Sequence, residues 1–241
     1  MMKKKKIIIS DIDGTFLARG GTGTEKNIKA AKHFVCAGGL FTFASGRLNI
    51  DDLIPTWREF VTAPLLLCNG ALVKNTAGEV LWEDPMDADL AREVHKACLT
   101  TGLDGTGSEI YTLDGSTFYK VTVWMKRENL DRIERMLRDR FGERCSYTYS
   151  CETLLEMMPP HVSKATAIEK LRDYYKKTGY ELTVYAVGDY INDLEMLVSA
   201  DISACPDDAH DEVKKISDII LCPSGEGAVA ELIRKITEEE I

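Results

Sequence analysis

The sequence predicts an α/β fold in which a doubly wound, Rossmann-like parallel sheet carries an inserted α+β domain. Near both ends of the chain, short apolar segments alternate with helix-like segments, and each apolar segment ends in polar residues. This pattern is typical of a parallel sheet covered by helices on both faces. The middle of the chain shows pairs of alternating strands instead. Because ligands bind beyond the carboxyl ends of parallel strands, we expect the polar segment ends to meet in one crevice.

The predicted core sheet consists of strands that share an apolar run followed by polar residues. The first contains three consecutive isoleucines, which suit a strand buried on both faces. A helix is expected next, from Glu25 to Ala37, closed by Gly38-Gly39. The predicted strands are residues 7–10, 40–44, 65–68, 182–187 and 202–204. We therefore assign residues 1–81 and 161–241 to the core.

The segment between them, residues 82–160, has the order α-β-β-α-β-β. Its predicted helices cover residues 87–101 and 128–140. Its predicted strands cover residues 109–113, 118–125, 145–151 and 154–158. Asp114-Gly115 is a typical hairpin turn between the first two of these strands. The order predicts a mixed sheet with helices on one face, which we call the cap.

The composition excludes several classes of protein. The 241 residues include 39 acidic and 30 basic side chains, a formal charge of −9. This balance argues against a nucleic-acid partner and means that an anionic substrate needs local cations. No apolar stretch reaches the roughly 20 residues that span a bilayer, so no membrane partner is expected. The seven cysteines form no Cys-x-x-Cys pair, which indicates reduced thiols in a cytoplasmic protein. Nothing indicates an obligate protein partner.

The most informative motif is Asp11-Ile12-Asp13-Gly14-Thr15, directly after the first strand. A turn at Gly14 can direct the two carboxylates apart. Such a pair can divide the chemistry, with one carboxylate attacking and the other transferring protons. The alternative is a solvated acidic turn capped by Thr15.

Three other segments suit a place beside this motif. Ser45-Gly46 follows the second strand and could hold a phosphate oxygen, or could form an ordinary turn. Lys164 begins a helical stretch, where lysine either serves a site or lies in solvent. Asp189 and Asp193 are four residues apart, so in a helical turn they share a face and could present oxygens to a hard cation. The alternative there is an N-capped helix.

Taken in order, these segments resemble the four motifs of the haloacid dehalogenase (HAD) superfamily of phosphatases, and the chain is similar to its Cof-like branch, which has a type IIB cap. The resemblance covers residues 1–81 and 161–241, and the order of the cap elements also fits. The matching residues are Asp11, Asp13, Gly14 and Thr15 for motif one, Ser45, Gly46 and Arg47 for motif two, Lys164 for motif three, and Gly188, Asp189, Asn192 and Asp193 for motif four. Asn69-Gly70-Ala71 resembles the family's third-strand loop.

The chain departs from the family pattern at two places. His161 stands where glycine is expected before the third motif, a change that bears on the approach to the site. Pro206-Asp207-Asp208-Ala209 replaces the more usual Gly-Asn-Ala after the last core strand, so no substrate contact is carried over to this position.

The resemblance implies a role for each matching residue. Asp11 would be the nucleophile that forms an aspartyl-phosphate, Asp13 the general acid and base, and Lys164 a catalytic cation. A Mg²⁺ ion would be held by Asp11, the Asp13 carbonyl and Asp189, with Asn192 and Asp193 supporting it. The phosphate and the substrate would contact Thr15, Ser45, Gly46, Arg47 and Asn69.

The implied activity is Mg²⁺-dependent hydrolysis of a small phosphorylated metabolite, with sugar phosphates as the best class. Two alternatives stay open: a phosphohexomutase of the same superfamily and a non-enzymatic phosphate-sensing module. Asp13 and the full cap favour the hydrolase over the sensor. Four cap residues are candidates for lining the site, although strand alternation does not say which of them face inward: Tyr111, Tyr119, Lys120 and Lys126.

Overall fold

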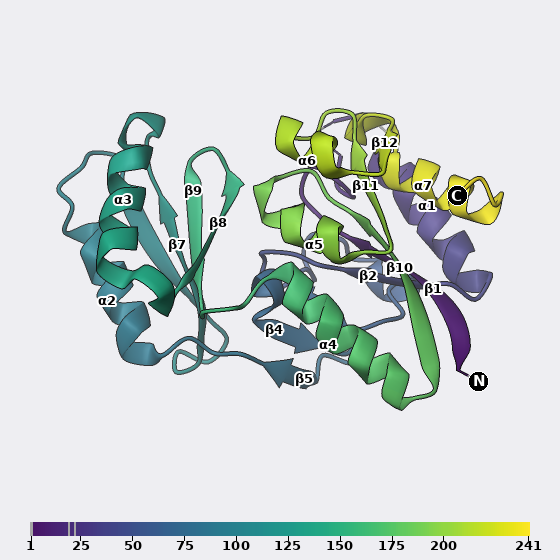
Figure 1. Cartoon of the computed structure of the whole chain (residues 1–241), viewed down its shortest axis with the longest axis horizontal. Helices are drawn as coiled ribbons and strands as arrows, with labels where there is room; N and C mark the ends of the chain where they lie inside the picture. The colour runs from purple at the N-terminus through teal and green to yellow at the C-terminus, as the bar shows by residue number, and fades with distance from the viewer. Residues whose placement is uncertain (1, 19, 22) are drawn as a thin grey trace.

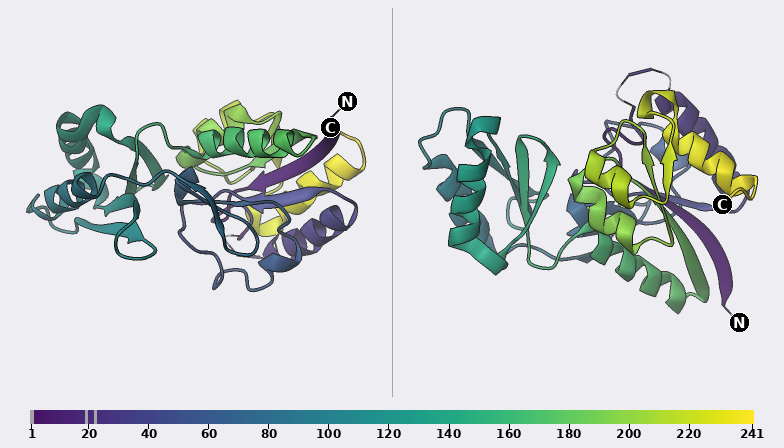
Figure 2. Two further views of the ribbon diagram at one scale, coloured as in Figure 1. Left: turned by 90° about the horizontal axis from the view of Figure 1, so that it is seen from below. Right: turned by 45° about the horizontal axis from the view of Figure 1, so that its top comes forward.

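The computed structural model describes residues 2–18, 20–21 and 23–241. The chain forms two units, joined by the two segments that precede helix α2 (Ala88–Leu99) and follow strand β9 (Leu154–Met158) (Figure 1). Both units stay separate in the other two views (Figure 2). None of the helices in the described residues is long and apolar enough to cross a membrane.

The larger unit is built on a five-stranded sheet in which every neighbouring pair is parallel. Its strand order is β12 (Ile219–Leu221), β11 (Ile202–Pro206), β10 (Tyr180–Val187), β1 (Lys3–Ser10) and β2 (Leu40–Phe43). Strand β1 is central, with Ile7 opposite both Val184 and Leu40. This arrangement confirms the predicted doubly wound α/β fold, and β1 extends four residues further toward the N-terminus than predicted.

Helices cover both faces of this sheet, and the isoleucines of β1 divide between them. Ile8 packs in the cluster that contains residues of α1 (Gly23–Cys36) and α7 (Ala228–Thr237). Ile7 and Ile9 pack in the cluster formed with α4 (Lys164–Lys177), α5 (Leu194–Ser199) and α6 (Asp211–Ile216). All three side chains are fully buried. Alternation along the strand therefore explains why the whole run is apolar.

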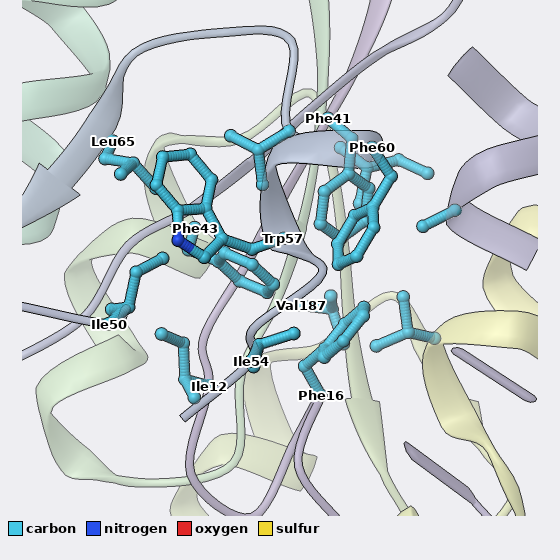
Figure 3. Close-up of a cluster of buried hydrophobic side chains, with 14 of the residues drawn as sticks. Ile12, Phe16, Phe41, Phe43, Ile50, Ile54, Trp57, Phe60, Leu65 and Val187 are labelled. Atoms are coloured by element: carbon cyan, nitrogen blue, oxygen red, sulfur yellow. The ribbon is translucent and has the colours of Figure 1, made fainter. Parts of the chain in front are cut away.

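Four phenylalanines anchor the chain just beyond the first motif (Figure 3). Phe16 lies 4.8 Å from Phe43 in an edge-to-face arrangement and 5.5 Å from Phe60 in a stacked one, measured between ring centroids. Phe41 lies 5.6 Å from Phe16. Aromatic pairs in these geometries add to the hydrophobic gain from burial. The loop that follows β1 is consequently held against the core three residues after Asp13.

The third predicted strand forms, but in a different sheet from the one expected. Strand β3 (Leu65–Leu67) pairs antiparallel with β4 (Leu72–Lys74), which pairs with β5 (Val80–Glu83). Its link to the core sheet is a single parallel bridge between Ala44 and Leu66. The short β4–β5 hairpin has no counterpart in the prediction. Strand β5 also continues two residues into the range predicted for the cap.

The smaller unit has the predicted element order but not the predicted sheet. Strands β6 (Gly107–Thr112), β7 (Phe118–Trp124), β9 and β8 (Ser146–Cys151) lie in the order β6-β7-β9-β8, and every neighbouring pair is antiparallel. The prediction of a mixed sheet was wrong: the central β7–β9 pair is antiparallel, as the two hairpin pairs on either side of it are. Helices α2 and α3 (Leu130–Phe141) cover one face (Figure 1). Its own hydrophobic cluster supports the division into core and cap, which stays a prediction.

Candidate active site

The loop after β1 sends its two carboxylates in different directions. Asp11 is buried, whereas Asp13 is exposed. Gly14 has φ 87°, in the left-handed region that favours glycine, and its N–H donates to the Leu17 carbonyl at 3.0 Å. The Leu17 N–H in turn donates to the Ile12 carbonyl at 2.7 Å. This tight turn separates the two aspartates, so each meets different partners.

Asp11 meets a buried ammonium group. Lys164 is the first residue of α4, and Ser163 caps that helix by accepting from the Thr166 N–H. The Lys164 Nζ donates to Asp11 Oδ1 at 2.7 Å and to Asp193 Oδ1 at 2.6 Å, and the lysine side chain is fully buried. One cation thus joins two carboxylates that lie far apart in the sequence.

The segment after β10 places two further carboxylates here, by loop geometry rather than by a shared helical face. Asp189 precedes the 3-10 helix Ile191–Asp193, so the predicted helical turn containing both aspartates is wrong. Instead, Asp193 Oδ2 accepts from the Asp189 N–H at 2.9 Å and the Tyr190 N–H at 3.2 Å. A Cβ atom on Gly188 would lie 2.5 Å from the Asp193 Cγ, so the close approach requires glycine.

The resulting cluster suits a divalent cation. Asp11, Asp189 and Asp193 each offer a carboxylate oxygen, and these oxygens lie within 4.8 Å of one another. Lys164 compensates one of the three formal charges and leaves two. Burial raises the pKa of Asp11 well above its ordinary value, and the charges of Asp193 and Asp189 add to the effect while Lys164 opposes it. Burial lowers the pKa of Lys164, but the two carboxylates outweigh it and raise that pKa. Hard oxygen donors carrying excess negative charge are what Mg²⁺ or Ca²⁺ binds.

Asp13 lies outside this cluster and is paired with Arg47. The guanidinium donates from Nε to Asp13 Oδ2 at 2.7 Å and from Nη2 to Oδ1 at 2.8 Å. Arg47 follows the end of β2, where its own N–H donates to the Ser45 hydroxyl at 3.2 Å. Such a bidentate pair fixes the plane of the carboxylate as well as its position.

A cavity of about 280 Å³ lies between these loops and the cap. Its core residues are Asp11, Asp13, Ser45, Gly46, Arg47, Asp189, Tyr190 and Asn192, and its cap residues are Tyr111, Lys120, Ser150, Leu154 and Glu156. The structure therefore brings together most of the predicted site residues in one crevice. A second cavity, of about 400 Å³, adjoins it and is lined by Asn69, Lys164 and Asn192 among others.

Thr15 and Asn69 make contacts with other site residues that the sequence did not predict. The Thr15 hydroxyl is fully buried and donates to Asp189 Oδ1 at 2.9 Å, so it orients a carboxylate of the cluster. Asn69 has φ 54° and donates from Nδ2 to Glu156 Oε2 at 2.5 Å, across the boundary between the two units. Their predicted contacts with phosphate and substrate stay predictions.

Two of the four cap candidates line the cavity and two do not. Tyr111 and Lys120 line the cavity. The Tyr119 hydroxyl instead donates to Glu83 Oε2 at 2.6 Å, and Lys126 pairs with Asp104 on the surface. Glu156 was missed, although a lone acidic residue inside the apolar run Leu154–Met158 was a usable signal. Ser150 and Tyr190 carried no such signal, because their positions depend on how the cap meets the core.

The two departures from the motif pattern have local explanations. His161 has φ 65°, which is the conformation for which glycine is the usual residue. Its side chain lines the second cavity rather than the first. Asp208 accepts from the Ser224 N–H and the Ser224 hydroxyl, both at 2.8 Å, and so ties the loop after β11 to the start of the last helical segment.

Comparisons with known proteins agree with this geometry. The family model for haloacid dehalogenase-like hydrolases matches residues 8–109 and 106–233. The chain is 28% identical over 218 residues to the HMP-PP phosphatase of Escherichia coli (strain K12), covering 78% of this chain and 79% of that protein. It is 22% identical over 286 residues to the 5-amino-6-(5-phospho-D-ribitylamino)uracil phosphatase of Bacillus subtilis (strain 168), covering 96% of this chain and 98% of that protein. The solved structure of a HAD subclass IIB sugar phosphatase covers the fold with a TM-score of 0.78 at 16% identity, over 97% of this chain and 99% of that one.

A doubly wound α/β core, an antiparallel cap and a buried acidic cluster beneath it define a capped phosphatase. The chain belongs to the haloacid dehalogenase-like hydrolases, and its fold is similar to that of a solved member of HAD subclass IIB.

Proposed function

We propose that the protein is a Mg²⁺-dependent phosphomonoesterase that hydrolyses small phosphorylated metabolites, sugar phosphates above all, through a phosphoryl group carried on Asp11. The observation that carries the proposal is the position of Asp11. Among the described residues, it is the carboxylate that both lines the 280 Å³ cavity and bonds the buried Lys164 ammonium. The relatives named above, which act on small phosphorylated compounds, support the same substrate class.

In the first step, a carboxylate oxygen of Asp11 attacks phosphorus and the bond to the leaving oxygen breaks. Asp13, in its acid form, donates a proton to that oxygen, so the product leaves as an alcohol. Water then attacks the phosphorus of the aspartyl-phosphate, and Asp13 accepts the proton of that water. Inorganic phosphate leaves and Asp11 is restored. Arg47 holds Asp13 in one orientation between the two proton transfers.

A carboxylate and a phosphate repel each other, by about 1 kcal/mol per charge pair at 4 Å in water and several-fold more in a dry site. Lys164 supplies one compensating charge. A Mg²⁺ ion bound by Asp11, Asp189 and the Asp13 carbonyl would supply the rest, and the carboxylate oxygens of Asp11 and Asp189 lie close enough together for such an ion. Asp193 positions Lys164 and the backbone of Asp189, which is a supporting role rather than direct catalysis.

The proposal is tested by measuring phosphate release from a panel of small phosphomonoesters, with Mg²⁺ and after treatment with EDTA. We expect release that requires Mg²⁺ and needs no bisphosphate activator. Transfer of the phosphoryl group to a second position of a sugar, dependent on a bisphosphate, would favour a phosphohexomutase instead. Stable binding of phosphate and Mg²⁺ without turnover of any ester would favour a phosphate sensor.

A further inference from the structure

The cap wall of the cavity carries a buried ion pair. The side chains of Lys120 and Glu156 are 2% and 3% exposed and form a salt bridge. Glu156 also accepts from Asn69, and the Lys120 ammonium lies 4.4 Å from the centre of the Tyr111 ring. A Cβ atom on Gly46 would lie 3.2 Å from both Glu156 oxygens, so the absence of a side chain there leaves room for this carboxylate. The wall is therefore polar and closely packed.

The register of the cap sheet explains why these groups face the core. Lys120 lies opposite Tyr111 in the β6–β7 pair, and Glu156 lies opposite Thr122 in the β7–β9 pair. Lys120 and Glu156 are thus diagonal neighbours on one face of the sheet. Val121 packs in the cluster on the other face, with α2 and α3. The helices cover the apolar face and leave this polar face to the cavity.

The cations on the walls of the cavity are already paired. Arg47 and Lys120 are the two cationic side chains among the described residues that line the cavity, and each binds a carboxylate of the same cavity. A second phosphate or a carboxylate on the leaving group would have to displace Asp13 or Glu156 to gain a cation. An uncharged hydroxyl group can instead donate to Glu156, or accept from Lys120, while the pair stays intact.

Two further features limit the leaving group. The buried Ser150 hydroxyl, which lines the cavity, has no hydrogen-bond partner among the described residues, and a buried polar atom normally has one. A ligand hydroxyl would supply it. The cavity of about 280 Å³ lies just below the range of roughly 300–1,000 Å³ found for sites of drug-sized ligands. It therefore suits a phosphoryl group with a small polar substituent.

We propose that the Lys120–Glu156 pair selects the leaving group: it accepts an uncharged group with neighbouring hydroxyls and rejects one with a second phosphate or a carboxylate. This rests on the proposed function, because the phosphoryl group must occupy the core side of the cavity. Two hydroxyls on adjacent carbons match a carboxylate and an ammonium in direct contact, one donating to Glu156 and the other accepting from Lys120.

The test measures binding rather than turnover. The Asp11→Asn protein is titrated by calorimetry, with Mg²⁺ present, with sorbitol 6-phosphate, 2-phosphoglycolate, fructose 1,6-bisphosphate and ethyl phosphate. Because hydrogen bonds to charged groups are strong, we expect sorbitol 6-phosphate to bind about tenfold or more tightly than ethyl phosphate. The two ligands with a second anionic group are expected to bind no more tightly than ethyl phosphate.

A second substitution, Glu156→Gln, leaves the Lys120 ammonium without its carboxylate. The affinity for 2-phosphoglycolate should then rise about tenfold relative to that for ethyl phosphate, and the affinity for sorbitol 6-phosphate should fall by a similar factor. Lys126→Gln is the matched control, since this lysine lies just beyond the same strand and pairs with Asp104 on the surface. It should leave all the affinity ratios unchanged.

Breaking one partner of a buried pair can prevent folding, so the double variant Lys120→Met/Glu156→Leu provides a second measurement. It should remove the advantage of sorbitol 6-phosphate without a gain for either anionic ligand. The proposal would be overturned if one of the two anionic ligands bound most tightly to the Asp11→Asn protein. It would also be overturned if neither Glu156→Gln nor the double variant altered the affinity ratios. Failure of all four ligands to bind would contradict the phosphoryl site itself, and so the function on which the proposal rests.

Discussion

Lys164 and Asp11 form a buried contact of 2.7 Å at the centre of the site. The two residues come from the start of α4 and the end of β1, and they are separated by 153 positions in the chain. The second carboxylate on the same ammonium, Asp193 at 2.6 Å, comes from a third segment. One lysine thus links three segments of the core, and one of its partners, Asp11, lines the cavity where a phosphoryl group would bind.

Replacing this lysine should destabilise the protein strongly. Lys164→Met leaves buried carboxylates without their cation, and loss of one partner from a buried pair costs about 3–5 kcal/mol. The free energy of unfolding from urea titration measures the effect. Lys170→Met is the control, because Lys170 pairs with Asp84 and both side chains are 39% exposed; its loss should cost no more than about 1 kcal/mol. Equal losses for the two variants would contradict the buried arrangement.

Mg²⁺ should stabilise the folded protein through the acidic cluster. A ligand at a hundredfold excess over its dissociation constant adds about 2.7 kcal/mol to the free energy of unfolding. Asp189→Asn should lose most of that gain, whereas Asp207→Asn, which changes an exposed carboxylate paired with Lys214, should keep it. The measurement is the thermal midpoint as a function of Mg²⁺ concentration. If Mg²⁺ still stabilised the Asp189→Asn protein to the same extent, the ion would have to bind at another site.

The stability of the metal-free protein should fall as pH rises above the ordinary range of a carboxyl group. Burial raises the pKa of Asp11, so the folded state holds this proton more tightly than the unfolded chain does. The free energy of unfolding therefore decreases between the unfolded pKa of about 4 and the raised folded pKa. Urea titrations in EDTA across this pH range should show the decrease, and Asp11→Asn should reduce it. The same pH dependence in the wild type and in Asp11→Asn would contradict the assignment.

Asp13 should control turnover with little effect on stability. Its pair with Arg47 is about half exposed, so Asp13→Asn should change the free energy of unfolding by no more than about 1 kcal/mol. Loss of general acid–base catalysis should lower kcat by about 10²–10⁴-fold. A kcat that stays near the wild-type value in Asp13→Asn would remove Asp13 from the proton transfers.

The substitution Arg47→Lys tests whether orientation matters. Lysine keeps the charge but cannot make the two parallel contacts of 2.7 and 2.8 Å. We expect kcat to fall while KM for a small phosphomonoester changes less, because the retained positive charge can still attract phosphate whereas the orientation of the proton donor is lost. A variant with wild-type kcat would show that Asp13 needs no such support.

The core and its motifs could be predicted because local rules determine them. Apolar runs that end in polar residues mark buried parallel strands, and the carboxyl ends of such strands meet at one edge. Asp11, Ser45 and Asp189 accordingly lie around one cavity. The antiparallel cap sheet was missed because element order does not specify the relative direction of β7 and β9, which no hairpin joins.

The cap side of the site depends on contacts that no local sequence pattern predicts. The helices that cover one face of the cap sheet decide which face of β7 points toward the core. The sequence could therefore offer Lys120 as one of four candidates but could not select it. Glu156 reaches the site beside Gly46, which leaves space for its carboxylate, and Asn69, which donates to it from a left-handed backbone conformation. Similarly, Thr15 was expected at the phosphate, but its hydroxyl lies close enough to Asp189 to bind it.

The central claim is that Asp11 carries the phosphoryl group, and the most direct test compares phosphate release by the wild type and Asp11→Asn. Both proteins are assayed with Mg²⁺ and with EDTA on the fastest ester of the panel, and circular dichroism confirms that the variant is folded. We expect release that needs Mg²⁺ and vanishes in Asp11→Asn. Release that survives in the folded variant would contradict the claim.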